Sequence, residues 1–377
     1  MFKAEELFQN ITDRNHPDET VLTIIQGKGT LPREQAGRNI HYDDASLSNY
    51  KKVEQGDFII HLRSFEGGLE MANEAGIVSP AYTILRCKRP HSSLFYDAYF
   101  HTDEFINHNL SKSVEGIRDG RQISYEAFKW LGIPYCEPTE QEKISTLFSA
   151  FNERIAKQRG LVESLKKYKR GLSKAVFSTN SELFPKSTVA SLGELFPFIR
   201  NGFVGTVTPF FTSQENGVRY LQGTNIHDGK ISDETAFYVT QAFNQKHSKN
   251  ILKSNDILVV QSGHVGECAV VGDNYAGSNC HALIIMSNGG ECASDYICQY
   301  INSDDGKKKI AAITTGNTIK HILATSIANI EVPLPSKKDQ QRIAELLNSW
   351  DNRIEQEIRN LCKLVRIKEG LLQQLFI

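Results

Sequence analysis

An acid and a lysine near the start of the chain are the first residues that could do chemistry. Pro17 and Asp18, followed by Gln26 and Lys28, have the proline, acid and Q-x-K spacing that some metal-dependent nuclease sites use. There, Asp18 would hold Mg²⁺ and Lys28 would orient the attacking water. The Gln26–Lys28 triplet is expected in a turn after a strand, and the second half of the chain has no counterpart. A stand-alone Mg²⁺-dependent nuclease is therefore only an alternative hypothesis.

A second candidate set could be imagined as a zinc site: Cys268, Cys280, His281, Cys292 and Cys298. The set contains no close ligand pair of the kind zinc sites use, and cysteines on strands are commonly small core residues. The sequence also has no phosphate loop, no G-x-S-x-G elbow and no H-E-x-x-H motif. We therefore expect no metal, no cofactor and no catalytic residue in this chain.

Polar side chains that suit recognition gather in turns. Arg, Lys, Asn, Gln, Ser and His read base edges in the major groove of duplex DNA. The candidate DNA-binding residues are Lys28, Arg33, Arg38, Arg63, Ser64, Arg118 and Arg121 in the first half and Gln222, Asn225, Gln261, Ser262, His264, Lys320 and His321 in the second. Any one of them could instead be an ordinary solvated loop residue. The sequence therefore indicates which loops could contact DNA and does not identify the contacting atoms.

Composition limits the class of protein. The chain has 377 residues, 40% hydrophobic content and a formal net charge of −1, which allows two or three domains and gives no global nucleic-acid signature. It contains no apolar run of 18 or more and opens without a signal peptide. Seven cysteines without a CxxC pair argue against a disulfide framework. These features predict a soluble, cytoplasmic protein without a membrane partner.

The elements that must position the loops are two long helices that repeat one another. Glu140–Phe177 aligns with Asp339–Phe376 without a gap at a shift of 199 residues, with ten identities in 38 positions. A helix of this length spans about 57 Å at 1.5 Å per residue. Two register-matched copies indicate an internal repeat, in preference to two unrelated surface helices.

Both helices carry a seven-residue apolar rhythm, which is typical of the a and d seam of a coiled coil. Such a stripe does not stay exposed in water, so the two helices are expected to pack on each other. Gln158 with Glu357 and Lys169 with Lys368 interrupt the seam at matching places. The predicted helix-pairing residues are Ile144, Phe148, Phe151, Ile155, Val162, Leu165 and Leu172 in the first helix and Ile343, Leu347, Trp350, Ile354, Leu361, Leu364 and Leu371 in the second, and Leu375 would continue the second row.

The segments before each helix also share a pattern. The first lacks helical periodicity and predicts short strands, such as 21–25, 58–60 and 82–85, and Thr139 with Glu142 predicts a capping box for the long helix. Asn255-Asp256 and its following strand lie 199 residues after Gly56-Asp57. The predicted domains are residues 1–137 and 188–334, with helices at 138–178 and 335–377 and a linker at 179–187.

The order globule, helix, globule, helix sends the second helix back along the first, so the pair is antiparallel. The predicted fold class is α+β, with two mixed α/β domains joined by two long antiparallel coiled-coil helices and related by an internal pseudo-twofold repeat.

The chain resembles the specificity subunits of type I restriction-modification enzymes. The resemblance rests on Pro138–Gln141 and Asp339-Gln340 before the heptad helices, on their ends at 169–177 and 368–376, and on the strands near Asp57 and Asp256. It covers essentially the whole chain, and the order and constant spacing of the motifs are more specific than any single motif.

The resemblance implies two target-recognition domains, each reading one half of a split, asymmetric site in double-stranded DNA. It implies that the helices set the separation of the half-sites and seat two adenine methyltransferase subunits, to which restriction and translocase subunits attach. S-adenosylmethionine, ATP and Mg²⁺ would belong to those partners, and this chain would be non-catalytic. A coiled-coil scaffold without a DNA role is the remaining alternative.

Overall fold

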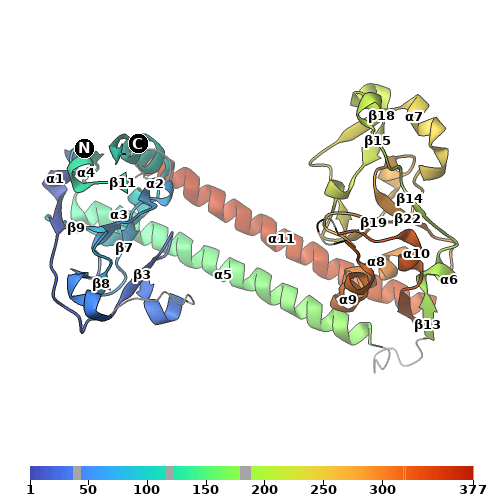
Figure 1. Cartoon of the computed structure of the whole chain (residues 1–377), viewed down its shortest axis with the longest axis horizontal. Coiled ribbons are helices and arrows are strands. Elements are labelled where there is room, and N and C mark those ends of the chain that lie inside the picture. Colours follow the sequence, from blue (N-terminus) through green and yellow to red (C-terminus); the bar gives the residue numbers. More distant parts are fainter. Residues whose placement is uncertain (37–43, 116–121, 179–187, 317, 319, 377) are drawn as a thin grey trace. The chain divides into compact units, whose positions relative to one another are not determined.

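The computed structural model describes residues 1–36, 44–115, 122–178, 188–316, 318 and 320–376. The chain forms two compact units (Figure 1). Unit 1 contains Met1–Gly160 and Ile358–Ile377, and unit 2 contains Leu161–Glu357. Two 39-residue helices, α5 (Pro138–Val176) and α11 (Lys337–Leu375), each contribute one part to unit 1 and the other part to unit 2.

Unit 1 is built on a four-stranded antiparallel sheet in the order β2-β9-β6-β7. The strands of unit 1 as a whole are β1 (Phe2–Lys3), β2 (Phe8–Ile11), β3 (Leu22–Ile25), β4 (Gly29–Pro32), β5 (Lys51–Val53), β6 (Phe58–Ile60), β7 (Glu70–Met71), β8 (Gly76–Val78), β9 (Thr83–Cys87), β10 (Val114–Glu115), β11 (Gln122–Ile123) and β12 (Gly132–Ile133). The short helices of unit 1 are α1 (Ala4–Leu7), α2 (Ser64–Gly67), α3 (Ser93–Phe100) and α4 (Tyr125–Phe128). A π-helical turn at Glu104–Asn109 lies between α3 and α4.

Unit 2 has the same central sheet, in the order β14-β22-β19-β20, and adds a three-stranded sheet β18-β15-β21. Its strands are β13 (Thr188–Ser191), β14 (Phe198–Asn201), β15 (Gly217–Leu221), β16 (Ile226–His227), β17 (Lys230–Ile231), β18 (Phe237–Thr240), β19 (Ile257–Val260), β20 (Cys268–Val270), β21 (Asn279–Cys280), β22 (Leu283–Ser287) and β23 (Glu331–Leu334). Its short helices are α6 (Leu192–Leu195), α7 (Gln241–Lys246), α8 (Ser294–Asn302), α9 (Asp304–Ile313) and α10 (Ala324–Ala328).

The turn before the central strand shows how closely the units repeat. In unit 1 the Gly56 N–H donates to Ala72 O at 2.8 Å, and in unit 2 the Asn255 N–H donates to Val271 O at 2.8 Å. Gly56 and Asn255 both have positive φ, of 91° and 68°. Asparagine tolerates this left-handed region better than other side chains, so Asn255 can replace glycine here. The predicted strand repeat is confirmed.

The two long helices are confirmed with small changes at their starts. Helix α5 begins at Pro138, so the predicted cap Thr139 already lies inside its first turn. Proline suits this place because its missing N–H has no partner inside a helix in any case. Helix α11 is capped by Ser336, whose Oγ accepts the Asp339 N–H at 3.2 Å.

Within each unit the helix segments run antiparallel. In unit 1, Phe148 early in α5 stacks on Phe376, just past the end of α11, with ring centroids 6.3 Å apart. In unit 2, Lys169 late in α5 forms a 2.6 Å ion pair with Asp351 early in α11. The buried pairing residues are Phe148, Ile155, Val162, Ile343, Leu347 and Ile354, and the half-buried ones are Ile144, Phe151, Leu165, Leu172, Trp350, Leu361, Leu364 and Leu371.

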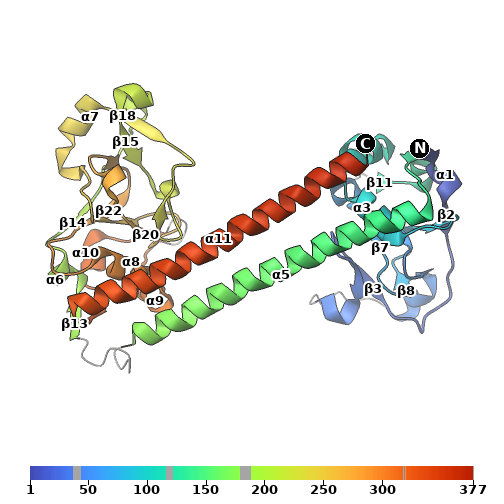
Figure 2. The ribbon, with the colours of Figure 1, turned by 180° about the vertical axis from the view of Figure 1, so that it is seen from behind.

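Each long helix is followed by a phenylalanine buried in an aromatic cluster. Phe177 packs on Tyr296 and Tyr300 of α8 in unit 2, at 5.5 and 5.2 Å between ring centroids. Phe376 packs in the same way on Phe95 and Tyr99 of α3 in unit 1, at 5.1 and 5.4 Å. Figure 2 shows the end of α11 close to α3. The prediction that Leu375 continues the apolar seam is wrong, because its side chain is 43% exposed, whereas that of Phe376 is 5% exposed.

Helix α3 corrects the expectation that the first segment has only strands. Its aromatic run buries Phe95, Tyr96, Tyr99 and Phe100 together. The sequence of α3 does not show a clear helical period of apolar and polar residues, because both members of the neighbouring pairs Phe95-Tyr96 and Tyr99-Phe100 are apolar and buried.

We predict that Phe376→Ala destabilises unit 1 by about 3–5 kcal/mol, because it leaves a cavity among buried rings. Leu375→Ala is the matched control, since it removes a neighbouring exposed side chain and should cost about 0.5 kcal/mol or less. Urea unfolding of the full chain would measure both free energies. Equal costs for the two variants would contradict this anchoring role.

Candidate nucleic-acid interface

Unit 2 gathers most of its predicted DNA-binding residues in one place, which we call the loop cluster: Gln222-Gly223, Gln261–His264 and Lys320–Ile322. The Ile322 N–H donates to Gln261 O at 3.1 Å, and Ser262 forms an isolated β-bridge with His321. Gly223 lies against this pair of segments, because a Cβ there would be 3.9 Å from His264 and 4.0 Å from Ser262 O. Three segments far apart in the sequence therefore form one surface.

The side chains of the loop cluster lie partly or fully at the surface of unit 2. Ser262, His264, Lys320 and His321 are exposed, and Gln222 and Gln261 are half-buried. Within the described residues, the Ser262 hydroxyl makes one long bond, of 3.5 Å, to Lys320 O. Lys320, Gln222, Gln261 and Ser262 offer a cation, amides and a hydroxyl, which are groups that bond to base edges and phosphates.

Asn225 is a correction to the predicted contact set. Its side chain is fully buried. It accepts the Gln222 N–H at 2.9 Å and donates to Ser232 O and Thr235 O at 3.0 and 2.7 Å. Asparagine satisfies local backbone groups in this way in many turns. Asn225 therefore shapes the Gln222 turn, and its side chain is not presented at the surface of unit 2.

Unit 1 presents Lys28 on the β3–β4 hairpin turn, with its side chain exposed. The buried Glu70 carboxylate accepts the N–H groups of Gly27 and Gly29 at 2.6 and 2.8 Å. The Asn73 amide donates to Lys28 O at 2.8 Å. The side chains of Glu70 and Asn73 thus hold the backbone of the turn, while the Lys28 side chain is exposed.

Arg63 and Ser64 form the turn after β6 that corresponds to Gln261–His264 of unit 2. Arg63 is exposed. Ser64 is a second correction, because it is fully buried and its Oγ accepts the His61 N–H at 2.9 Å. This turn lies beside the Lys28 hairpin, since the Gln26 amide packs directly against Gly67 of α2. We call the Lys28 turn and Arg63 the turn cluster.

The remaining basic candidates are less informative. Arg33 lies at the start of a 3₁₀ turn, with its guanidinium 5.9 Å from the centre of the Tyr50 ring. Arg38, Arg118 and Arg121 fall outside the residues that the structure describes.

Glu70 and His101 also shift each other's pKa. Burial acts against the charged form of His101, but the hydrogen bond to Glu70 and the nearby Asp97 outweigh it and raise the pKa of His101 to about 8. Burial likewise opposes ionisation of Glu70, and the bonds from His101, Gly27 and Gly29 prevail and lower its pKa. Burial lowers the pKa of His61 beside them. The sequence prediction missed Glu70, although an acid next to an apolar strand segment is a signal for a buried, paired carboxylate.

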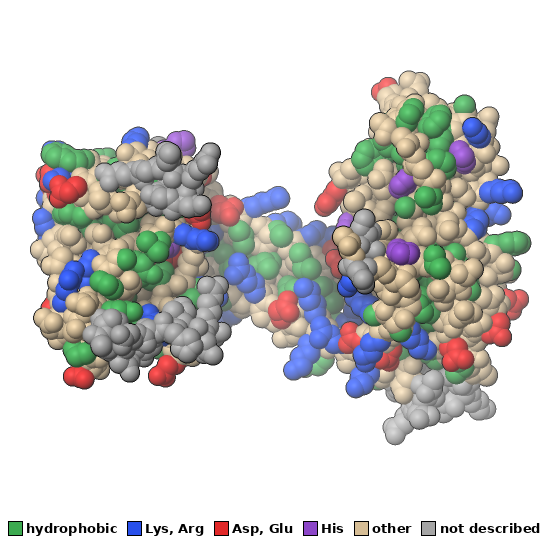
Figure 3. Space-filling model, viewed as in Figure 1, with side chains coloured by type: hydrophobic (Ala, Val, Ile, Leu, Met, Phe, Trp, Pro, Cys, Tyr) green, Lys and Arg blue, Asp and Glu red, His purple; other side chains and the backbone are tan. Residues whose placement is uncertain are grey.

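A mixed-charge surface covers α5 and α9 in unit 2 (Figure 3). Its exposed basic side chains are Lys166, Lys167, Arg170, Lys174, Lys307 and Lys308. Asp304 and Asp305 lie among them, 3.9 Å from Arg170 and 3.5 Å from Lys308. Because both signs alternate, this surface is less suited to phosphate binding than an unbroken basic patch.

The nuclease alternative is not supported. Gln26 is used in packing against Gly67, and Lys28 is held in a hairpin turn. The cysteines that were considered as zinc ligands are buried core residues. The sulfurs of Cys268 and Cys298 are 3.4 Å apart, and both residues lie in the core, as do Cys280 and Cys292. Burial raises the pKa of Cys280 to about 12 and that of Cys292 to about 11, which suits neutral core thiols.

Two copies of one fold, each placing polar loops beside its central strands, define a recognition subunit with two binding units. Residues 182–363 match the family described as the type I restriction modification DNA specificity domain. The MjaVIII specificity subunit of a type I restriction enzyme from Methanocaldococcus jannaschii is 23% identical over 86% of this chain and 79% of its own length. A putative MjaX specificity subunit from the same organism is 24% identical over 67% of this chain and 60% of its own length.

Solved structures share the fold. The S subunit of a type I restriction-modification system from M. genitalium has a TM-score of 0.60 at 15% identity, covering 100% of this chain and 95% of that one. A chain from a study of complex assembly and conformational transition of the type I R-M system has a TM-score of 0.59 at 16% identity, with coverage of 100% and 96%. Residues 182–363 thus carry a type I restriction modification DNA specificity domain, and over most of its length the chain is similar to specificity subunits of type I restriction enzymes.

We predict that the His101–Glu70 pair makes unit 1 less stable in mild alkali. A pKa raised from 6.5 to about 8 on folding contributes about 2 kcal/mol below pH 6.5, and this contribution is lost as the pH rises through about 8. Urea unfolding at about pH 6 and about pH 9 should show this loss in the native chain and not in His101→Gln. His108→Gln, which changes an exposed histidine of unit 1, is the control. An equal pH dependence in His101→Gln would refute the pairing.

Proposed function

We propose that this specificity subunit directs a type I restriction-modification complex to a bipartite, asymmetric site in double-stranded DNA. Unit 1 reads one half through its turn cluster, and unit 2 reads the other half through its loop cluster. The observation that carries the proposal is that both units keep one central sheet while the residues after the matching strands differ. Arg63 and Lys28 suit phosphate or guanine contacts, whereas Gln261, Ser262 and His321 suit mixed hydrogen bonding.

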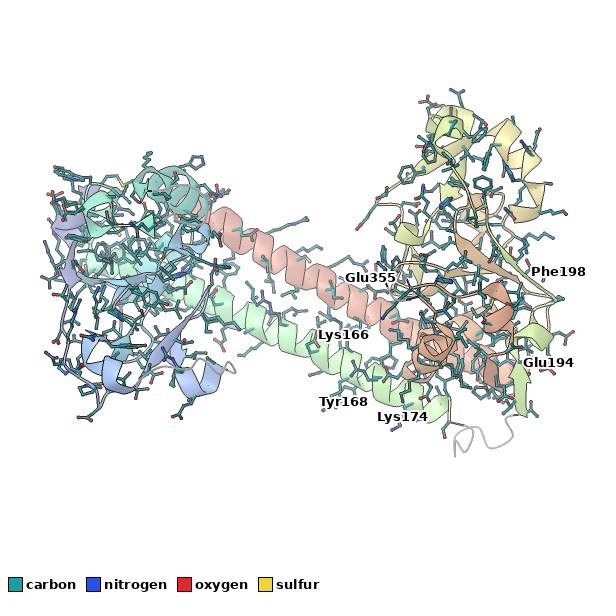
Figure 4. All side chains as sticks on the ribbon, viewed as in Figure 1. Lys166, Tyr168, Lys174, Glu194, Phe198 and Glu355 are labelled. Atoms are coloured by element: carbon teal, nitrogen blue, oxygen red, sulfur yellow. The ribbon has the colours of Figure 1, made fainter. Side chains whose placement is uncertain are left out.

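We also propose that the long helices bind the partner subunits, two adenine methyltransferase subunits to which restriction and translocase subunits attach. Support comes from large apolar side chains on α5 and α11 that the helix pairing leaves exposed. They are Leu147, Leu161, Tyr168, Leu346, Ile358 and Ile367. Tyr168 is 69% exposed and stacks on Trp350 at 6.3 Å, and Figure 4 labels it on α5. Aromatic side chains of this kind are frequent anchors of protein interfaces.

The reactions in this proposal take place on the partners. S-adenosylmethionine serves the methyltransferase subunits, and ATP and Mg²⁺ serve the restriction subunits, while this chain binds and positions DNA. The complex would act in the cytoplasm. Among the described residues, no helix is long and apolar enough to cross a membrane.

Mapping methylated adenines in cells tests the reading of DNA by each unit. Cells would express this chain, or a variant, with its neighbouring methyltransferase. We predict that Gln261→Ala with Ser262→Ala relaxes only one half of a split motif, since each lost base contact weakens discrimination by about 1–3 kcal/mol. Lys28→Ala should affect the other half or, if it contacts phosphate, weaken binding overall and reduce its salt dependence.

Lys112→Ala is the control, because it removes another exposed lysine of unit 1 outside the turn cluster. A methylation pattern that does not depend on this chain would refute the specificity role and favour a scaffold without DNA contacts. Changes in both halves from the unit 2 variant alone would refute the division of labour between the units.

A further inference from the structure

Three side chains at the edge of the loop cluster converge in unit 2. His227 lies at the end of β16, His264 in the loop after β19, and Glu267 just before β20. One ligand atom from each lies within 4.8 Å of the others. The two imidazole rings are nearly parallel, with their centroids 5.2 Å apart. This grouping contains none of the residues for which a metal was considered from the sequence.

The hydrogen bonds of both histidines select the same tautomer of the neutral ring. His227 Nε2 is 2.8 Å from Thr224 O, and His264 Nε2 is 3.2 Å from Ile226 O. A carbonyl oxygen only accepts, so each Nε2 must carry the hydrogen. In the neutral rings, each Nδ1 then keeps a free lone pair. Metal-bound histidines have this arrangement, with the second ring nitrogen donating to a carbonyl or carboxylate.

Glu267 supplies an oxygen that lacks a partner of its own. Its Oε2 atom is buried and makes no hydrogen bond within the part of the chain that the structure describes. It lies 3.9 Å from His227 Nδ1, which is too long for a hydrogen bond. A buried carboxylate oxygen without a partner is unfavourable, and a cation between these two atoms would remove that penalty.

We propose that His227, His264 and Glu267 bind a divalent transition-metal ion of the zinc class. Two imidazoles and one carboxylate suit Zn²⁺, Co²⁺ or Ni²⁺, whereas Mg²⁺ and Ca²⁺ prefer oxygen ligands throughout. Zn²⁺ bonds of about 2.0–2.2 Å place tetrahedral ligands roughly 3.3 Å apart. The ligand atoms, which lie within 4.8 Å of one another, would approach to this separation when the ion binds.

The ion would join two segments that matter for recognition. The β16–β17 hairpin carries His227, and its Lys230 Nζ donates to Asn352 Oδ1 of α11 at 3.2 Å and pairs with Glu355. Figure 4 labels Glu355 on α11. The loop that carries His264 also carries Gln261 and Ser262. Metal binding would therefore hold the loop cluster to the hairpin and, through it, to α11 within unit 2. This consequence rests on the proposed function, whereas binding of the ion does not.

Unit 1 provides an internal comparison. At the same shift of 199 residues, Phe65 and Gly68 stand where His264 and Glu267 stand in unit 2. The ion would thus serve only one of the two recognition units.

Titration of the purified full chain with ZnCl₂ tests the site without DNA. After treatment with a chelator, calorimetry should show tight binding of one equivalent, and Co²⁺ should give the visible absorption of a low-symmetry nitrogen and oxygen site. His227→Ala and Glu267→Gln should each weaken binding by at least about 100-fold, since they remove direct ligands. His108→Ala is the control with an equally accessible histidine, and MgCl₂ should not compete.

Binding that persists unchanged in both ligand variants, for example through the exposed Cys362 thiol, would overturn the proposal, as would no stoichiometric binding at all. His227 is half exposed, so its variant should fold, and circular dichroism would verify this. The role in recognition has a separate readout, because chelation should relax one half of the methylation motif only. Zinc binding with unaltered half-sites would overturn that role and leave the metal site standing.

Discussion

Burial of the apolar seam along α5 and α11 is the constraint on which the rest of the structure depends. A 39-residue amphipathic helix cannot leave its stripe in water, and each helix finds its cover in the other. The seam ends in aromatic clusters, where Phe177 completes the core of unit 2 and Phe376 that of unit 1. The core of unit 1 therefore includes Leu372 and Phe376 from the far end of the sequence, and the core of unit 2 includes Val176 and Phe177 from the end of α5. Residues 1–137 alone lack part of the unit 1 core.

The two units show which parts of the repeated fold can diverge. The central four-stranded sheet and the turns at Gly56 and Asn255 are the same, because their backbone hydrogen bonds admit few alternatives. The flanking strands differ in extent: in unit 1 Val21 and Ile77 form an isolated parallel bridge, whereas in unit 2 the parallel strands β15 and β21 belong to an added three-stranded sheet. Variation is concentrated in segments next to the polar loops. This is the division that two readers of different sequences need, with a constant support and changeable edges.

Periodic patterns were the reliable guide from the sequence, since a seven-residue apolar rhythm has few other physical explanations. The long helices and strands such as β6 and β19 followed from such patterns. Helix α3 did not, because its paired aromatic residues are buried on several sides at once. The candidate loops were found, but Ser64 and Asn225 were assigned the wrong role, since residue type does not tell whether a polar side chain bonds to its own turn or faces solvent. The His227, His264 and Glu267 grouping depends on the hairpin fold, and only the close pair His264 and Glu267 gives a hint of it in the sequence.

Buried polar side chains hold the backbone of the candidate loops, so the exposed side chains of these loops can differ while the backbone conformation stays the same. Glu70 holds the Lys28 turn through two N–H groups, and Asn225 holds the Gln222 turn through three backbone bonds. These bonds go to the main chain, so they place no demand on the side chain that the turn presents. Replacing the exposed Lys28 side chain would leave the bonds from Glu70 to the turn in place. Replacing Glu70 or Asn225 instead leaves buried backbone groups without partners, which costs stability and loosens every contact of that loop. Selection for a new DNA target can therefore act on the exposed residues while the buried polar ones stay constant.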